Sequence, residues 1–237
     1  MNAILNKNTT FIDLGLIDFK AGWDYQTALF EQTLNIKSEN RKVPERAQAT
    51  ENFLLFCEHP NVYTLGKSGK DANLLLNHHE LASIDATFYR INRGGDITYH
   101  GPGQLVGYPV IDLENFFTDI HKYMRNLEEA VIQTLGEFDL KAGRIAGLTG
   151  VWVDAENERA RKICALGVKT SRWVTMHGFA LNVNPDLKYF GNIVPCGIQD
   201  KAVTSLEKEI GAAVDMVAVK EIMRKKIADV FGMNLTY

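Results

Sequence analysis

Three strand-like segments follow one another in the second half of this chain without a helical pattern between them. The segments VWVD, KICALGVK and VTMHGFALNV begin at Val151, Lys162 and Val174 and are separated by polar turns. Consecutive strands joined by short turns pair antiparallel, whereas parallel neighbours need long crossover connections. We therefore expect an antiparallel meander here, and not an alternating βαβ array.

The rest of the chain supplies further strands and separate helices. Segments rich in β-branched, aromatic and aliphatic residues predict strands over Thr10 to Leu14, Phe53 to His59, Val62 to Gly66, Thr87 to Asn92 and Leu105 to Leu113. Apolar residues at helical spacing predict helices over Asp24 to Ile36, Asp119 to Phe138 and Val214 to Phe231. Residues 37–51 are polar and are expected to form an exposed loop. The expected fold class is α+β, with a mixed, largely antiparallel sheet and flanking helices.

Composition excludes several other classes of protein. The chain has 237 residues, of which 46% are hydrophobic and 23% charged, as in a globular protein. No repeat or linker divides residues 1–237, so we expect a single domain. No apolar run approaches the roughly 20 residues of a spanning helix, and the N-terminus lacks a secretory pattern, so no membrane association and a cytoplasmic location are expected. The net charge of -3 argues against nucleic acid as a partner.

The stretch RGGDITYHGPGQLVGY, from Arg93 to Tyr108, contains five glycines and a proline. Glycine allows positive φ and lets another molecule approach the main chain closely. The stretch is therefore either an elaborate turn or a site. A phosphate cradle is disfavoured, because the GxxxxGK[ST] pattern is absent.

The cysteines differ in their surroundings. Cys57, Cys164 and Cys196 are odd in number and have no CxxC spacing, which argues against disulfides and a zinc ribbon, and we expect no metal. Cys57 and Cys164 lie within apolar strands and are expected to be core thiols. Cys196 lies in a polar loop, IVPCGIQDKAVTSL, where it is either a reactive thiol or an incidental loop residue.

A reactive thiol needs a group that accepts its proton, because its ordinary pKa is about 8.5. The candidates are Lys162 and the histidines His59, His100 and His177. Lys162 begins an apolar strand, where burial would lower its pKa toward a useful value. The alternative is a lysine that extends to solvent beside Arg161. A structural imidazole is the simpler reading of His177, and the role of His100 stays open.

Four segments together resemble one known family. RGGDITYHGPGQLVGYPVIDL is similar to the signature of bacterial lipoyl(octanoyl) transferases, also called lipoate-protein ligase B, within the biotin/lipoate protein ligase superfamily. FLLFCEHPNVYTLG, GVWVDAENERARKICALGVKTSRWVTMHGFALNV and FGNIVPCGIQDKAVTSL match in the same order. The match covers the chain from about Phe53 to Leu206. It implies a single α/β catalytic domain whose sheets surround an acyl-binding tunnel.

The resemblance also implies roles for individual residues. Cys196 in VPCG matches the nucleophile that becomes the acyl thioester, and Lys162 in KICALG matches the lysine that activates it. The family pattern does not require Cys57. The implied substrate-binding residues form three short groups: Arg93, Gly94, Gly95, Asp96, Ile97, Thr98, Tyr99 and His100; Ala165, Leu166 and Gly167; and Gly178, Phe179 and Ala180.

The implied reaction transfers an octanoyl or lipoyl group from acyl carrier protein to a lysine of a lipoyl domain, on an E2 subunit or on glycine cleavage H protein. No cofactor is implied. An ATP-dependent ligase of the same superfamily would activate a free acid and needs no cysteine nucleophile, so Cys196 argues against it. An amidotransferase that moves the acyl group between lipoyl domains also uses cysteine and stays open as an alternative.

Basic residues cluster on either side of the Lys162 strand. They are Arg144, Arg159, Arg161, Lys169 and Arg172. Because both protein substrates of the family are expected to be acidic, these residues suggest a basic docking rim. An ordinary solvated face is an equally good reading.

Overall fold

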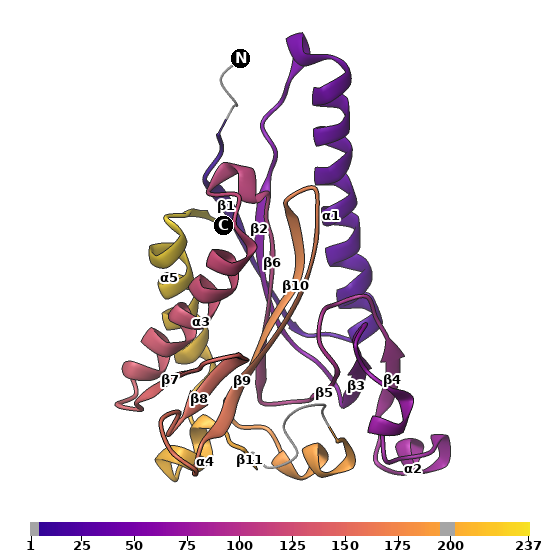
Figure 1. Cartoon of the computed structure of the whole chain (residues 1–237), viewed down its shortest axis with the longest axis vertical. Coiled ribbons are helices and arrows are strands. Elements are labelled where there is room, and N and C mark those ends of the chain that lie inside the picture. Colours follow the sequence, from indigo (N-terminus) through magenta and orange to yellow (C-terminus); the bar gives the residue numbers. More distant parts are fainter. Residues whose placement is uncertain (1–4, 195–201) are drawn as a thin grey trace.

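The computed structural model describes residues 5–194 and 202–237, and most of its strands form one sheet (Figure 1). Nine described strands belong to it. They are β1 (Asn8–Leu16), β2 (Asn52–Glu58), β6 (Gln104–Val110), β7 (Ala142–Ile145), β8 (Leu148–Val153), β9 (Arg161–Ser171), β10 (Val174–Asn182), β11 (Ala202–Val203) and β12 (Asn234–Thr236). Their order is β12-β1-β2-β6-β10-β9-β8-β7, with β11 beside β9. The sheet is antiparallel from β2 to β7 and parallel at the β1 edge.

A smaller sheet lies beside the lower part of the large one in Figure 1. It contains β3 (Val62–Leu65), β4 (Thr87–Arg90) and β5 (Ile97–His100) in the order β4-β3-β5. β3 runs parallel to β4 and antiparallel to β5. The loop between β4 and β5 therefore carries the glycine pair of the RGGDITYH segment.

The long helices cover opposite faces of the large sheet (Figure 1). The helices are α1 (Phe19–Lys42), α2 (His78–Ser83), α3 (Ile120–Gly136), α4 (Leu206–Ile210) and α5 (Met216–Phe231). Neighbouring residues of a strand point to opposite faces. Leu54 of β2 accordingly packs in one core with Leu127 of α3 and Met223 of α5. Leu55 packs in a second core with Phe30 of α1.

The structure confirms the mixed sheet and the antiparallel meander, which is β8, β9 and β10. The helices expected over Asp119 to Phe138 and Val214 to Phe231 are α3 and α5. The strand segments expected before them are β1, β2, β3, β4 and β6. The periodicity missed four short strands, β5, β7, β11 and β12, of which β5 lies inside the glycine-rich segment.

The expectation of an exposed loop over residues 37–51 is wrong for its first part. Helix α1 begins earlier than predicted, because the Asp18 carboxylate accepts a hydrogen bond from the Ala21 N–H and caps it. The helix also runs on to Lys42. Lys37 lies buried on its inner face, where its ammonium is 2.5 Å from a carboxylate oxygen of Asp112. Local polarity could not reveal this long-range ion pair.

Candidate functional site

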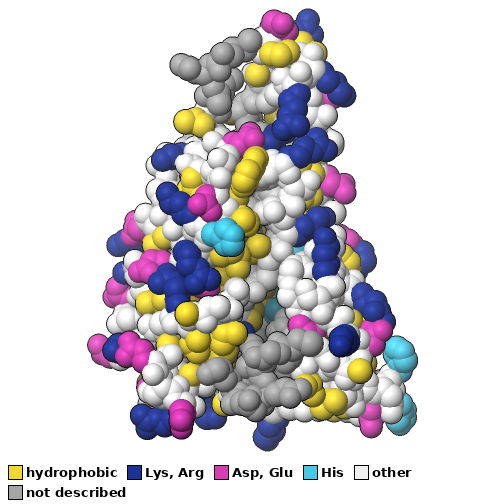
Figure 2. All heavy atoms as spheres, in the orientation of Figure 1, with side chains coloured by type: hydrophobic (Ala, Val, Ile, Leu, Met, Phe, Trp, Pro, Cys, Tyr) yellow, Lys and Arg dark blue, Asp and Glu magenta, His cyan; other side chains and the backbone are white. Residues whose placement is uncertain are grey.

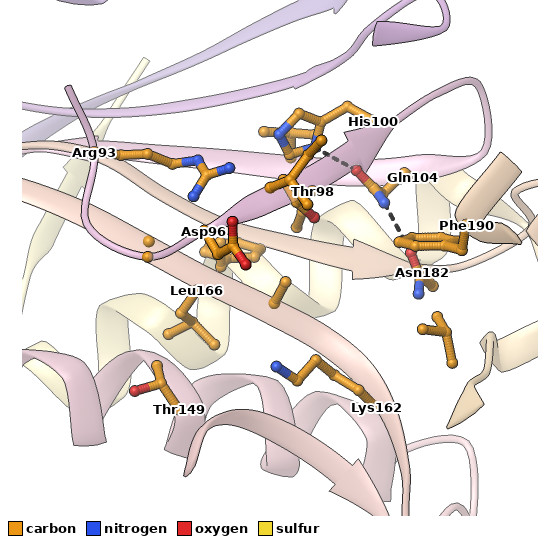
Figure 3. Close-up of a pocket in the computed structure, with 18 of the residues that line it drawn as sticks. Arg93, Asp96, Thr98, His100, Gln104, Thr149, Lys162, Leu166, Asn182 and Phe190 are labelled. Carbon is orange, nitrogen blue, oxygen red and sulfur yellow. Dashed lines mark hydrogen bonds between the residues drawn. The ribbon is translucent and has the colours of Figure 1, made fainter. Parts of the chain in front are cut away.

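A cavity of about 620 Å³ lies between the small sheet and the centre of the large one. Residues of β5, β6, β9 and β10 line it, together with residues of the 3₁₀ helix η4 (Leu187–Asn192). Figure 3 shows the labelled side chains from these elements pointing toward a common space. Its volume falls in the range of small-ligand pockets, roughly 300–1,000 Å³.

Two of the three predicted binding groups form one wall of this cavity. In the antiparallel pair β9–β10, Gly167 lies opposite Gly178, Leu166 opposite Phe179, and Ala165 opposite Ala180. All of these residues line the cavity. The structure thus brings together two segments that are separate in the sequence and that the family resemblance predicts to bind the same substrate.

The third group, Arg93 to His100, approaches the same wall through its glycines. The Gly94 N–H donates to the Val168 carbonyl at 2.9 Å. A Cβ atom on Gly167 would lie 2.9 Å from the Gly94 carbonyl oxygen, which is closer than real contacts allow. The glycines therefore let the β4–β5 loop pass directly over β9, and other residues of the same stretch line the cavity.

Two members of this group do not line the cavity. Gly94 lies where the β4–β5 loop crosses β9. Tyr99 points into the core of the small sheet, where its hydroxyl donates to Asn61 Oδ1 at 2.8 Å. The others do line it: Arg93, Gly95, Asp96, Ile97, Thr98 and His100.

Arg93 is a buried cation in the cavity wall, with 8% of its surface exposed. Its Nη2 donates to the carbonyl and hydroxyl oxygens of Thr64, at 2.7 and 3.0 Å, and its Nη1 donates to the Gly94 carbonyl. Burial lowers its pKa to about 10. The guanidinium therefore stays charged near neutral pH while it fixes the loop.

Lys162 points into the cavity from the other side (Figure 3). Its ammonium lies 4.6 Å from the centre of the Trp152 ring, a cation–π contact. Burial lowers the pKa of Lys162 to about 8, so that a neutral amine is accessible near physiological pH. The expected alternative, a lysine that extends to solvent beside Arg161, is not what the structure shows.

A one-residue irregularity in β9 directs Lys162 into the cavity. Trp152 of β8 pairs with Lys162, while the preceding Val151 pairs with Cys164, so β9 has one additional residue, Ile163, between these pairs. Such a bulge shifts the alternation of side chains. Without it, Lys162 would share the face of Cys164, which packs into the core beneath α3 and α5.

The histidine of the glycine-rich segment is held neutral. His100 Nδ1 donates to Gln104 Oε1 at 2.6 Å, and Gln104 in turn donates from Nε2 to Asn182 Oδ1 at 2.8 Å (Figure 3). An amide oxygen only accepts, so the His100 proton is on Nδ1 and Nε2 is unprotonated. Burial lowers the pKa of His100 to about 3.

Sequence reasoning missed Gln104 and Asn182, which also line the cavity. Asn182 donates from Nδ2 to the Thr204 carbonyl at 2.9 Å, and the Thr204 N–H donates to the Lys162 carbonyl at 2.9 Å. A chain of hydrogen bonds thus connects His100 with the Lys162 backbone. Gln104 follows the RGGDITYH segment closely, but nothing in the sequence indicates the partner on β10.

The other two candidate histidines are also neutral and hydrogen-bonded. Burial lowers the pKa of both, that of His177 to about 3. His177 Nε2 lies 3.1 Å from Asn92 Oδ1. His59 donates from Nδ1 to the Ile17 carbonyl and accepts at Nε2 from the Tyr108 hydroxyl. The structural reading of His177 is consistent with these contacts, although its side chain lines the cavity.

Cys57 and Cys164 are buried, and burial raises the pKa of each thiol. Both therefore remain protonated core thiols, as expected. The predicted nucleophile, Cys196, lies outside the described residues. Val194 and Val203, which lie on either side of residues 195–201, line the cavity.

Two members of the expected basic rim form ion pairs within the chain itself. Arg144 binds the carboxylates of Glu128 and Glu129, and Arg161 binds those of Asp154 and Glu209. These ion pairs neutralise the arginines. On the face drawn in Figure 2, basic side chains are interspersed with acidic ones.

No group of three or more metal-ligating side chains occurs within residues 5–194 and 202–237. In the same part of the chain, no helix combines the length and the apolar character needed to cross a membrane.

Comparisons with known proteins place these features in a family context. Residues 21–228 match the family model described as the lipoyl protein ligase A/B catalytic domain. A protein of Cytophaga hutchinsonii named octanoyltransferase is 60% identical over 237 residues, covering 99% of this chain and 97% of that one. The octanoyltransferase of Flavobacterium psychrophilum is also 60% identical, over 98% of this chain and 100% of its own.

Solved structures share the fold at low sequence identity. A bipartite lipoate protein ligase from Thermoplasma acidophilum, studied with its E2 lipoyl domain, superposes with a TM-score of 0.71 at 16% identity, covering 98% of this chain and 86% of that chain. A lipoate-protein ligase A bound with ATP gives a TM-score of 0.69 at 14% identity, over 98% and 88% of the two chains.

Proposed function

The chain belongs to the lipoyl protein ligase A/B family and catalyses octanoyl transfer in lipoate biosynthesis, and from this premise we propose the donor, the intermediate and the residues that act. The donor is octanoyl acyl carrier protein, and the octanoyl group passes through a thioester on Cys196. The acceptors are lipoyl domains, specifically those of E2 subunits and of glycine cleavage H protein. The reaction takes place in the cytoplasm.

The observation that carries the proposal is the amine of Lys162 in the cavity, with its pKa lowered to about 8 by burial. A proton-transfer group works best when its pKa lies near the operating pH. Cys196 follows Val194, a cavity-lining residue, by two positions in the sequence. These features support a lysine and a cysteine that act on the same acyl group.

In the first step, Lys162 takes the proton of the Cys196 thiol, and the thiolate attacks the thioester carbonyl of the donor. The bond from the carbonyl carbon to the carrier sulfur breaks, and the carrier thiolate takes the proton back from Lys162. One thioester replaces another, so the step is close to neutral in energy and needs no ATP.

In the second step, the amine of the acceptor lysine attacks the acyl group on Cys196. Lys162 accepts the proton that the amine loses and returns it to the departing cysteine thiolate. An amide replaces a thioester, which makes this step favourable. The other predicted binding residues that line the cavity, in the β4–β5 loop, β5, β9 and β10, form the walls around the octanoyl chain.

The test is the intact mass of the protein after incubation with octanoyl acyl carrier protein. We expect an octanoyl adduct that hydroxylamine removes, and no adduct in Cys196→Ala. Cys57→Ala is the matched control, because Cys57 is buried and does not line the cavity, and it should still form the adduct. Octanoyl transfer by Cys196→Ala at the wild-type rate would contradict the thioester.

A second arm of the same experiment tests the donor. An octanoylated lipoyl domain is supplied in place of the acyl carrier protein, with a second, unmodified lipoyl domain as acceptor. We expect transfer from the carrier protein to be faster. Faster transfer between the two lipoyl domains would instead identify an amidotransferase.

A further inference from the structure

Glu128 is a carboxylate with no exposed surface, placed on α3 below the cavity wall. Its Oε1 lies 3.0 Å from Arg125 Nη2 and accepts a hydrogen bond from the Gly150 N–H at 3.0 Å. Its Oε2 lies 3.0 Å from Arg144 Nε. A buried charge is costly unless it is paired, and these contacts provide the pairing. Glu128 itself does not line the cavity.

Gly150, which Glu128 holds, lies directly against the stem of Lys162. A Cβ atom on Gly150 would lie 3.2 Å from Cε and 3.5 Å from Cδ of Lys162. Gly150 has a φ of 123°, which other residues rarely adopt. The hydrogen bond from Glu128 therefore fixes a part of β8 that forms the floor under the lysine stem and whose backbone conformation suits glycine.

We propose that Glu128 is a positioning residue for Lys162: it fixes Gly150 beneath the lysine stem and supplies a buried negative charge that favours the ammonium form. The proposal rests on the proton-transfer role of Lys162 stated above. It adds a residue of α3 to the site, although no atom of that residue reaches the substrate.

Several described charged or titratable groups surround this arrangement. Cys164 neighbours Lys162 on β9, and burial keeps its thiol protonated. Arg125 and Arg144 face Glu128, and Glu129 binds Arg144 from the solvent side. The two arginines offset part of the Glu128 charge, so its effect on Lys162 is smaller than that of an unpaired carboxylate.

The negative charge of Glu128 determines the direction in which it shifts the pKa of Lys162. Burial lowers the pKa of Lys162, and Glu128 acts in the opposite direction. Glu128→Gln removes the negative charge, so the pKa of Lys162 should fall further. Because the arginines offset part of the charge, we expect a shift of about half a unit to one unit, below the usual 1–3 units for an opposite charge close by.

The experiment measures this shift in two ways. Competitive acetylation with peptide mass spectrometry gives the pKa of Lys162 without any catalytic turnover. The pH dependence of kcat/KM for octanoyl transfer should show the same shift of its ascending limb to lower pH. Glu129→Gln is the matched control, because Glu129 binds the same Arg144 but does not contact Gly150. It should leave both curves in place.

Glu128→Asp separates charge from position. It keeps the carboxylate but withdraws it from Gly150, so the pKa of Lys162 should stay close to the wild-type value, while kcat should fall below that of the wild type because Gly150 is no longer fixed. An unchanged Lys162 titration in Glu128→Gln overturns the proposal. If the same titration shows that Lys162 has its ordinary pKa in the wild type, or if Lys162→Ala transfers octanoate normally, the proposed function fails instead.

Should Glu128→Gln not fold, Arg144→Gln provides the second test. The Arg144 side chain is 30% exposed, and its removal takes away one of the cations that offset Glu128. The Lys162 titration should then move to higher pH. No movement in that variant would also overturn the proposal.

Discussion

Burial controls the protonation of every candidate proton acceptor near the cavity, with different results for lysine and histidine. Burial lowers the pKa of Lys162 to about 8, whereas it lowers those of His100 and His177 to about 3. At neutral pH both imidazoles are uncharged, so they are not present as imidazolium acids, and they are weak bases. Lys162 is the group whose proton can move readily in this range.

Replacing Lys162 should therefore affect the pH dependence of transfer. Lys162→Arg keeps a positive charge but cannot deprotonate, so we expect kcat/KM at pH 7.5 to fall by at least about 100-fold. Lys162→Ala should recover in part at high pH, where the Cys196 thiolate forms unaided. Lys188→Arg, at an exposed lysine, is the control and should match the wild type. A wild-type pH profile in Lys162→Arg would exclude proton transfer by this residue.

At this scale most of the site residues predicted from the sequence line the cavity, because short motifs such as KICALG carry them in fixed order. It could not identify Gln104, Asn182 or Glu128 as partners. Their contacts join β6 to β10 and α3 to β8. Such contacts depend on tertiary packing, which leaves no local pattern in the chain.

At the scale of elements, the approach of the β4–β5 loop to β9 determines the shape of the cavity. Gly167→Ala would place a Cβ atom 2.9 Å from the Gly94 carbonyl and 3.1 Å from Arg93 Cδ. We expect the loop to move, stability to fall by about 1–3 kcal/mol, and octanoyl transfer to decrease. Urea unfolding and steady-state rates measure these effects.

Gly143→Ala on β7 is the matched control for this substitution. Its added Cβ atom would make only an ordinary contact, 3.5 Å from Ala155 Cβ. It should be as stable and as active as the wild type, or slightly more stable. Equal behaviour of the two variants would show that the loop does not need its close approach to Gly167.

Element types were predictable from periodicity, whereas their ends and irregularities were not. The apolar spacing that predicts α3 ends close to the observed boundaries. The additional residue Ile163 in β9 has no such signal, because KIC reads as ordinary strand sequence. Similarly, the extension of α1 to Lys42 depends on the distant Asp112.

The whole molecule has a pH-dependent stability that follows from its buried histidines. An unfolded histidine has a pKa near 6.5, and that of folded His177 is about 3. Between these values the unfolded chain binds a proton that the folded chain does not, so the free energy of unfolding falls as the pH drops. The contribution of the buried neutral histidine to the free energy of unfolding is fully present above pH 6.5. From pH 7.5 to pH 5, one such histidine costs about 2 kcal/mol.

The variant His177→Asn tests this linkage, since asparagine tolerates the positive φ of 59° at this position and does not titrate. The difference in unfolding free energy between pH 7.5 and pH 5 should shrink by about 2 kcal/mol. Urea unfolding at both pH values measures it. His121→Gln, at an exposed histidine, should keep the wild-type difference. An unchanged difference in His177→Asn would contradict the assignment.

The order of the strands is the part of the architecture that local patterns could not supply. Periodicity and composition predicted the α+β class. They did not predict that β1 pairs in parallel with both β2 and β12. The second pairing joins Thr10 to Thr236 across almost the entire chain. Only the completed fold brings these residues together.

This last pairing has a consequence for synthesis. A ribosome makes β1 before all the other strands of the sheet and β12 after them, so the edge of the sheet beside β1 stays open until β12 has been synthesised. An open edge can pair with a strand of another chain, and such long-range pairing also slows folding. In Figure 1, the C-terminus and the label of β1 lie well above β5 and β11. A nascent chain could therefore assemble its cavity while its unfinished edge is still vulnerable to aggregation.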